Sequence, residues 1–171
     1  MTPEPPTPRR GLPFDPIEEA ARTWSGHWPE MPRMRAVTSL MRVHQLVLTE
    51  LDELLRPMGL TFARYEVLVL LAFSRRGALP LGKIGERLQV HATSVTPLVK
   101  RLEAAALINR TPHPEDGRAV LASITAQGRA VMEQATEAIT QARFALGALT
   151  EDECDRLTTL LRSPREAAGD F

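Results

Sequence analysis

The sequence predicts a mainly α-helical protein with a small two-stranded wing, a winged helix-turn-helix flanked by further helices at both ends. Three observations predict this fold. Residues 81–88 carry apolar side chains at helical spacing. A second amphipathic pattern starts after a break near residues 89–90. Two short apolar runs, 107–110 and 120–124, then flank a loop rich in proline and charge. In this order, the elements offer one helix to a DNA major groove and a charged loop to the minor groove.

The second helix of this pair is the candidate recognition helix. Its apolar residues between Val95 and Leu102 recur at helical spacing, so that stripe should face the core. The opposite face carries short hydroxyls and a cation, which suit base edges and phosphates. The predicted DNA-binding side chains of this face are Thr93, Ser94, Thr96 and Lys100.

Pro97 lies inside this helix, and two interpretations of it stay open. A proline in a helix interior removes one backbone hydrogen bond and costs roughly 3 kcal/mol, so the ring would bend the axis. Alternatively, the proline leaves a flat apolar contact for a thymine methyl group. In the second case Pro97 joins the DNA-binding set.

The loop between the two strands ends in Asp116-Gly117-Arg118. Asp116 can accept hydrogen bonds from Arg118 or from loop N–H groups, and so hold the loop with the arginine projecting outward. Arginine is favoured where a minor groove narrows, which makes Arg118 a candidate minor-groove contact. The alternative is an ordinary surface ion pair of little energetic weight.

Three segments of this region resemble the signature of MarR-type regulators: residues 102–110, 116–118 and 124–129. The likeness extends from about residue 34 to residue 161. It implies a homodimeric winged-helix transcription factor, usually a repressor, that binds double-stranded DNA at a pseudo-palindromic operator. It also implies a DNA affinity that falls when a small ligand or an oxidant binds. A two-fold operator would place the recognition helices about 34 Å apart.

The charge distribution agrees with a DNA-binding module in the middle of the chain. The formal net charge is zero, yet residues 75–129 hold nine Lys and Arg against four Asp and Glu. In residues 130–171 the corresponding counts are four and eight. Basic excess on one module is typical of nucleic-acid binding.

Other classes of protein are disfavoured by the sequence. No apolar run approaches the ~20 residues of a membrane span, and no signal peptide is evident, so we expect a cytoplasmic protein without a membrane partner. One cysteine and four scattered histidines give neither a disulfide nor zinc-ligand spacing. We therefore expect no metal and no cofactor. Ser94, His91 and Asp116 lack a nucleophile elbow, so we expect no catalytic site and no enzyme.

The chain is expected to form a disordered proline-rich arm, 1–14, and a single domain, 15–171. Within that domain the winged helix-turn-helix covers about 61–125, and dimerisation helices cover about 15–58 and 126–163. Helices are expected from residue 16 to about 27, 33 to 58, 125 to about 146, and 150 to about 162. Thr61 and Thr125 are expected to cap helices, and Thr150 with Glu153 fits a capping box.

The extra N-terminal helix, with its two tryptophans, resembles the MarR branch that responds to urate. Residues 37–42 and 59–66 are similar to regulators of that branch that respond to trans-aconitate and citrate. The likeness implies a small anionic ligand, a carboxylate or a urate-like molecule, bound between the dimer helices and the DNA-binding lobe. An anion needs cations and an apolar wall. The candidate ligand-binding residues are Trp24, Trp28, Arg42, His44, Arg64 and Glu66.

Each of these residues also has a structural interpretation. The tryptophans would anchor the first helix, Arg64 and Glu66 would form an ion pair, and His44 would be a satisfied core histidine.

Two further alternatives concern the signal and the function. The run from Thr96 to Lys100 is similar to the branch that senses organic hydroperoxides, although that branch senses with a cysteine near its N-terminal dimer helix. This chain has only Cys154, whose acidic neighbours disfavour the thiolate. A thiol-responsive regulator is one alternative, and a winged-helix module for protein association without DNA binding is another.

Overall fold

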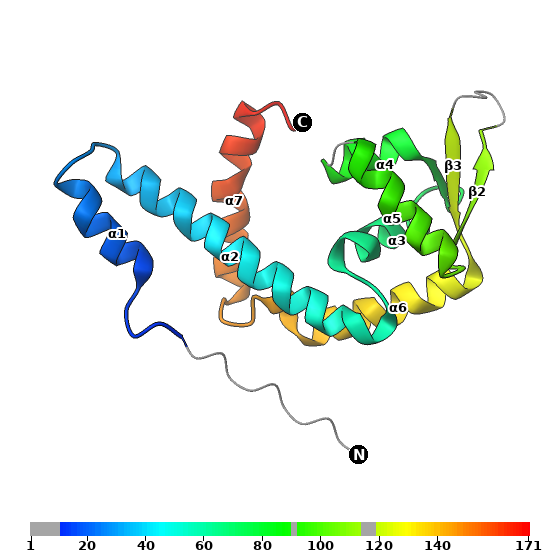
Figure 1. Ribbon diagram of the computed structural model, residues 1–171, viewed down its shortest axis with the longest axis horizontal. Coiled ribbons are helices and arrows are strands. Elements are labelled where there is room, and N and C mark those ends of the chain that lie inside the picture. Colours follow the sequence, from blue (N-terminus) through cyan, green and yellow to red (C-terminus); the bar gives the residue numbers. More distant parts are fainter. Residues whose placement is uncertain (1–10, 90–91, 114–118) are drawn as a thin grey trace, which may run out of the picture. The chain divides into compact units, whose positions relative to one another are not determined.

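The structure is a computed structural model that describes residues 11–89, 92–113 and 119–171, with the side chains of 92 and 93 left out. Most of the predicted arm therefore lies outside the described residues, as do Asp116 and Arg118. Contacts within the chain divide it into two compact units, Met1–Leu46 and Val47–Phe171. Each unit is described by itself below, and one helix, α2, spans the boundary (Figure 1).

The first unit contains helix α1, Pro16–Ser25, and the beginning of α2, Met31–Leu55. Asp15 caps α1, because its carboxylate accepts hydrogen bonds from the backbone N–H groups of Ile17 and Glu18 at 2.8 and 3.4 Å. The helix ends before residue 27, since the N–H of Gly26 already bonds the Trp24 carbonyl. The second helix begins two residues earlier than the sequence predicts.

The second unit holds the winged helix-turn-helix and the C-terminal helices. After α2 a 3-10 turn, Arg56–Met58, ends at Gly59, which adopts the left-handed conformation with φ 69°. The remaining elements are α3 (Phe62–Ala72), β1 (Ala78–Pro80), α4 (Leu81–Leu88), α5 (Ala92–Ala104), β2 (Ile108–Pro112), β3 (Val120–Ile124), α6 (Ala126–Gln141) and α7 (Glu151–Ala167). The predicted fold class, mainly helical with a small wing, is confirmed.

The wing belongs to a three-stranded antiparallel sheet in the order β1-β3-β2. Strands β2 and β3 form the predicted hairpin, with Pro112 opposite Val120 (Figure 1). The third strand, β1, was not expected from the sequence. It pairs with the other side of β3, with Ala78 opposite Ser123, and so joins the wing to the end of α3.

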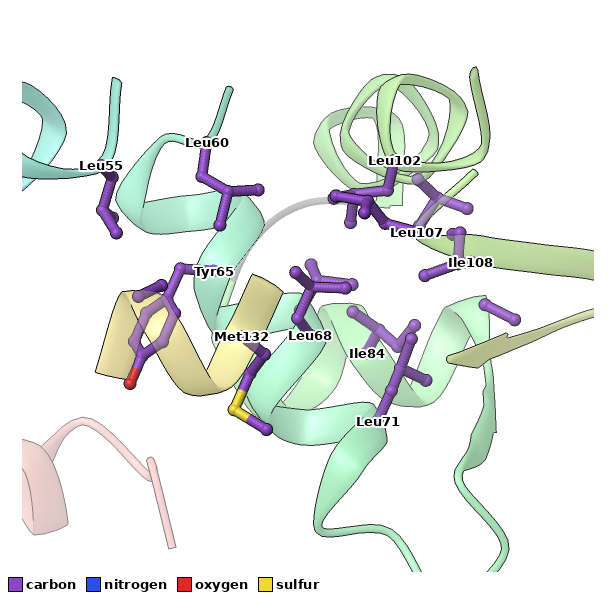
Figure 2. Packing of buried hydrophobic residues seen from close by; sticks show 14 of the residues in the cluster. Leu55, Leu60, Tyr65, Leu68, Leu71, Ile84, Leu102, Leu107, Ile108 and Met132 are labelled. Carbon is purple, nitrogen blue, oxygen red and sulfur yellow. The ribbon is translucent and has the colours of Figure 1, made fainter. Parts of the chain in front are cut away.

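One buried apolar cluster holds these elements together. Figure 2 shows Leu68 and Leu71 of α3 near Ile84 of α4, with Leu102 of α5 and Ile108 of β2 on the other side. The five side chains are at most 1% exposed. This cluster fixes the buried faces of α4 and α5, and therefore determines which residues those helices expose.

The C-terminal helices differ from the sequence prediction at their ends. Helix α6 ends at Gln141 rather than near residue 146, because the residues of the following 3-10 turn, Arg143–Ala145, adopt positive φ. Helix α7 continues to Ala167 instead of about 162. Its predicted capping box is confirmed: Thr150 and Glu153 exchange backbone and side-chain hydrogen bonds. These bonds stabilise the carboxylate and lower the pKa of Glu153. No helix in the described ranges is long and apolar enough to span a membrane.

Candidate nucleic-acid interface

Helix α4 ends at the turn that the sequence predicts. It buries Ile84 and Gly85 in the core, while Lys83 and Glu86 form an exposed ion pair at 2.7 Å. Gln89 terminates the helix in the left-handed conformation, with φ 51° and ψ 34°. A non-glycine residue adopts this conformation only where the surrounding structure requires it. The chain therefore turns sharply before α5 begins at Ala92.

Helix α5 has a buried face and an exposed face, as predicted for a recognition helix. Val95, Val99 and Leu102 are at most 1% exposed and lie in the core. On the other side Ser94, Pro97 and Lys100 are exposed, and Thr96 is half-buried. The side chain of Thr93 lies outside the described part. The exposed positions thus form one face of hydroxyl, apolar and cationic character, the combination that base edges and phosphates can accept.

Pro97 lies within α5, which continues on both sides of it from Ala92 to Ala104. Its exposed ring points away from the core face of the helix. Both interpretations of this residue, a bend in the helix axis and a contact to thymine, remain predictions.

The wing is tied to α5 by an ion pair that sequence reasoning missed. Arg110 of β2 donates from Nε to the Glu103 carboxylate of α5 at 2.7 Å, and both side chains are partly shielded from solvent. At the far end of the hairpin, the N–H of His113 bonds the Ala119 carbonyl at 2.9 Å. Asp116 and Arg118 lie between these two residues, outside the described ranges, and their DNA-binding roles remain predictions.

In the first unit, both tryptophans named as ligand residues line one cavity of about 510 Å³. Its walls come from α1 and the residues after it: Ala20, Thr23, Trp24, His27 and Trp28. The Trp24 indole N–H donates to the Pro29 carbonyl at 2.7 Å, which leaves the ring faces as the apolar wall. Arg42 and His44 lie on the part of α2 that belongs to the first unit, and both side chains are exposed.

In the second unit, Arg64 and Glu66 have different surroundings. The Arg64 guanidinium donates to the Gly59 carbonyl at 2.7 Å and to the Thr61 hydroxyl at 3.2 Å. It therefore closes the turn before α3, and its described hydrogen bonds go to these oxygens rather than to Glu66. Glu66 is half-buried, and its desolvation raises the pKa of the carboxyl group above the usual range.

Two observations concern metal and thiol chemistry. No three His, Cys, Asp or Glu side chains among those residues lie close enough together to hold a metal ion. Cys154 is a free, half-buried thiol on α7.

Taken together, a helix-turn-helix, an exposed polar face on its second helix and a β-hairpin define the class of winged helix-turn-helix proteins. The model of the MarR family matches residues 60–120. The structure of Sco5413, a MarR family transcriptional regulator from Streptomyces coelicolor, is 51% identical over 82% of this chain and 97% of that chain, with a TM-score of 0.77. The chain belongs to the MarR family.

Curated relatives agree with this assignment. The HTH-type transcriptional repressor MdtR of Bacillus subtilis is 33% identical over 117 residues, covering 67% of this chain and 74% of the relative. The organic hydroperoxide resistance transcriptional regulator of the same organism is 36% identical over 84 residues. That match spans 49% of this chain and about half, 56%, of the relative. All of these proteins are transcriptional regulators, so the prediction of a regulator rather than an enzyme is confirmed.

Proposed function

We propose that the protein is a homodimeric repressor that binds a pseudo-palindromic operator in double-stranded DNA and releases it when a small anionic metabolite binds. The observation that carries the proposal is the exposed face of α5, where Ser94, Pro97 and Lys100 lie opposite the buried Val95 and Val99. A helix held by its apolar side and offering short polar side chains outward can enter a major groove.

The residues of this interface would divide between phosphate and base contacts. Lys100 would bind a phosphate, whereas Thr93, Ser94 and Thr96 are short enough to reach base edges or nearby backbone oxygens. Pro97 would contact a thymine methyl group. Asp116 would hold the wing loop so that Arg118 enters the adjacent minor groove.

The first experiment measures fluorescence anisotropy on DNA from upstream of the protein's own coding region, at near-physiological salt. We expect preferential binding over scrambled DNA, and weaker binding by Arg118→Ala. Equal affinity for both DNAs at every salt concentration would contradict operator recognition, and would favour a protein-association module.

The dimer is supported by a row of exposed apolar residues on α2. The large exposed apolar side chains of the part of α2 in the first unit, residues 31–46, are Val37, Leu40, Met41, Val43 and Leu46. An apolar stripe of this length on a single chain is typical of a surface that a second copy covers.

We predict that Leu40→Glu shifts the protein from dimer to monomer, because burying an unpaired carboxylate in an apolar interface is strongly unfavourable. Sedimentation velocity at micromolar protein measures the shift. Thr38→Glu, which adds the same charge at an exposed position on a different side of the same helix, is the control. A dimer that survives Leu40→Glu unchanged would place the interface elsewhere.

For the effector, we propose a di- or tricarboxylate such as trans-aconitate or citrate, or a urate-like anion. The tryptophan-lined cavity of the first unit offers an apolar wall, and Arg42, exposed on the part of α2 that belongs to the same unit, offers a positive charge. Only a ligand that binds the DNA-free state more tightly can release DNA, and DNA must weaken ligand binding by the same factor.

Anisotropy titrations with each acid test this effector. We expect release of the operator, and loss of that response in Trp24→Ala and in Arg42→Ala with operator affinity retained. An operator affinity indifferent to all three anions would remove them as candidates. Release by an organic hydroperoxide that disappears in Cys154→Ser would instead indicate oxidant sensing.

Glu66 gives a prediction about pH. Burial raises its pKa, so the folded protein holds this proton more tightly than the unfolded chain does. The stabilising effect of that proton is fully present below the ordinary pKa of glutamic acid, and is lost as the pH rises through the raised value. We expect Glu66→Gln to increase the free energy of unfolding at pH 7 and to change it little at pH 4. Urea unfolding at both pH values measures this difference, and an equal effect at both would contradict it.

A further inference from the structure

The turn after α3 presents an aromatic side chain to solvent among three arginines. Phe73 is 82% exposed, the highest value among the large exposed apolar side chains of the described residues. Together with Arg75, Arg76 and Arg87 it lines a depression of about 390 Å³. We call these four residues the Phe73 patch.

The turn that carries Phe73 is held by hydrogen bonds. The Ser74 hydroxyl donates to the carbonyls of Leu71 and Ala78 at 2.8 and 3.3 Å. The N–H of Gly77 bonds the Ser74 carbonyl at 3.1 Å, and the Gly77 carbonyl accepts from Ile124 of β3 at 3.0 Å. The exposed ring therefore stands on a fixed backbone, and a partner would pay little conformational entropy to use it.

The arginines of the patch have no described acidic partner. Ion pairs elsewhere in the described chain satisfy other arginines, among them Arg110 with Glu103 and Arg165 with Asp170. No such pair within the described ranges includes Arg75, Arg76 or Arg87, and all three are exposed. The patch thus joins three available guanidinium groups to one apolar ring, and its complement is a segment with carboxylates beside an apolar side chain.

Strand register places the patch away from the proposed DNA contact of the wing. Pro112 and Val120 pair at the end of the hairpin that carries the 113–119 loop. Strand β1 runs along β3 with Ala78 opposite Ser123, toward the other end. The α3–β1 turn therefore lies at the end of the sheet opposite that loop. A protein partner bound at this turn would therefore not compete with DNA whose minor groove is bound at the loop.

We propose that the Phe73 patch is a docking surface for an acidic segment of another protein, which covers the Phe73 ring with an apolar side chain and pairs its carboxylates with Arg75, Arg76 and Arg87. This goes beyond operator and effector binding, and it does not depend on either of them. Arginine is one of the residue types that contribute most binding energy at protein interfaces, and phenylalanine is enriched at their buried centres.

The test uses the full chain and a labelled synthetic peptide in which Asp and Glu alternate with Leu and Phe. A second peptide replaces each acid with its amide. We expect the acidic peptide to bind, and the amide peptide to bind at least about tenfold more weakly, a difference of roughly 1.4 kcal/mol. Phe73→Ala and Arg76→Glu should each weaken the acidic peptide by a similar factor. Arg156→Glu, an exposed reversal of the same charge on α7, should leave it unchanged.

Controls test whether the variants still fold and bind the operator, and whether the patch binds DNA or lipid instead of an acidic peptide. The variants should keep the unfolding midpoint and the operator affinity of the original protein, because Phe73 packs against little and lies at the far end of the sheet from the 113–119 loop. Peptide affinity that is equal in all variants, or absent in the original protein, would overturn the proposal. The proposal would also be overturned if the variants lost more affinity for duplex DNA, or for vesicles of anionic phospholipid, than for the acidic peptide.

Discussion

Replacing Lys100 with alanine should weaken operator binding at least about tenfold and reduce its dependence on salt. Lys100 is exposed on α5, one turn beyond Thr96 and on the side away from the buried Val95 and Leu102. Each phosphate contact contributes a slope of roughly 0.9 in a plot of log affinity against log salt. A dimer carries two copies of Lys100, so the slope should fall by roughly 1.8 in the variant.

This prediction is checked by anisotropy titrations on the operator over a series of salt concentrations. Arg156→Ala serves as the control, because it removes an exposed positive charge from α7. Ser94→Ala should behave differently from Lys100→Ala, changing the preference among operator sequences while leaving the salt slope intact. If Lys100→Ala keeps both the affinity and the slope, α5 does not lie against the phosphates and the proposed orientation is wrong.

The sequence predicts α5 well because its signals are local. An apolar side chain every three or four residues is visible without knowledge of any contact, and the core indeed takes Val95, Val99 and Leu102. Caps are equally local, and the predicted caps at Thr61 and Thr125 accept the expected backbone hydrogen bonds. These two kinds of signal were sufficient to place most of the helices.

Strand β1 and the Glu103–Arg110 ion pair could not be predicted in the same way. Three residues, Ala78–Pro80, are too few to show a strand period, and they form a strand only because β3 lies beside them. Glu103 and Arg110 belong to different elements separated by a turn. Their separation in sequence therefore follows neither the helix period nor the strand period. Both features depend on the fold of the whole unit.

The proposed ligand residues show a further limit. Arg64 and Glu66 are neighbours in sequence, which suggested an ion pair, but the arginine bonds a carbonyl and a hydroxyl of the preceding turn. Glu66 is half-buried and its pKa is raised, which periodicity alone cannot indicate. Their use in ligand binding rests on the family likeness and remains a proposal.

Gly128→Ala should destabilise the fold by about 3 kcal/mol, near the upper end for added atoms in a packed site. Gly128 lies in the first turn of α6, where its N–H donates to the Thr125 hydroxyl at 2.9 Å. A Cβ at this position would lie 2.0 Å from the carbonyl oxygen of Leu107 and 2.9 Å from a side-chain carbon of Ile124. The nearest obstacle is backbone, so no change of rotamer relieves the clash.

The Leu107 carbonyl also accepts hydrogen bonds from the Thr125 backbone and hydroxyl, both at 3.1 Å, so moving it breaks the junction between the wing and α6. Urea unfolding measures the loss, with Gly82→Ala as the matched control. A Cβ on Gly82, in the first turn of α4, meets nothing within 4 Å. That change should be neutral or stabilise by up to ~1 kcal/mol, because alanine is the better helix former. Similar unfolding midpoints for the two variants would show that α6 does not approach Leu107 this closely. A large difference would mean that one glycine sets the distance between the wing and α6.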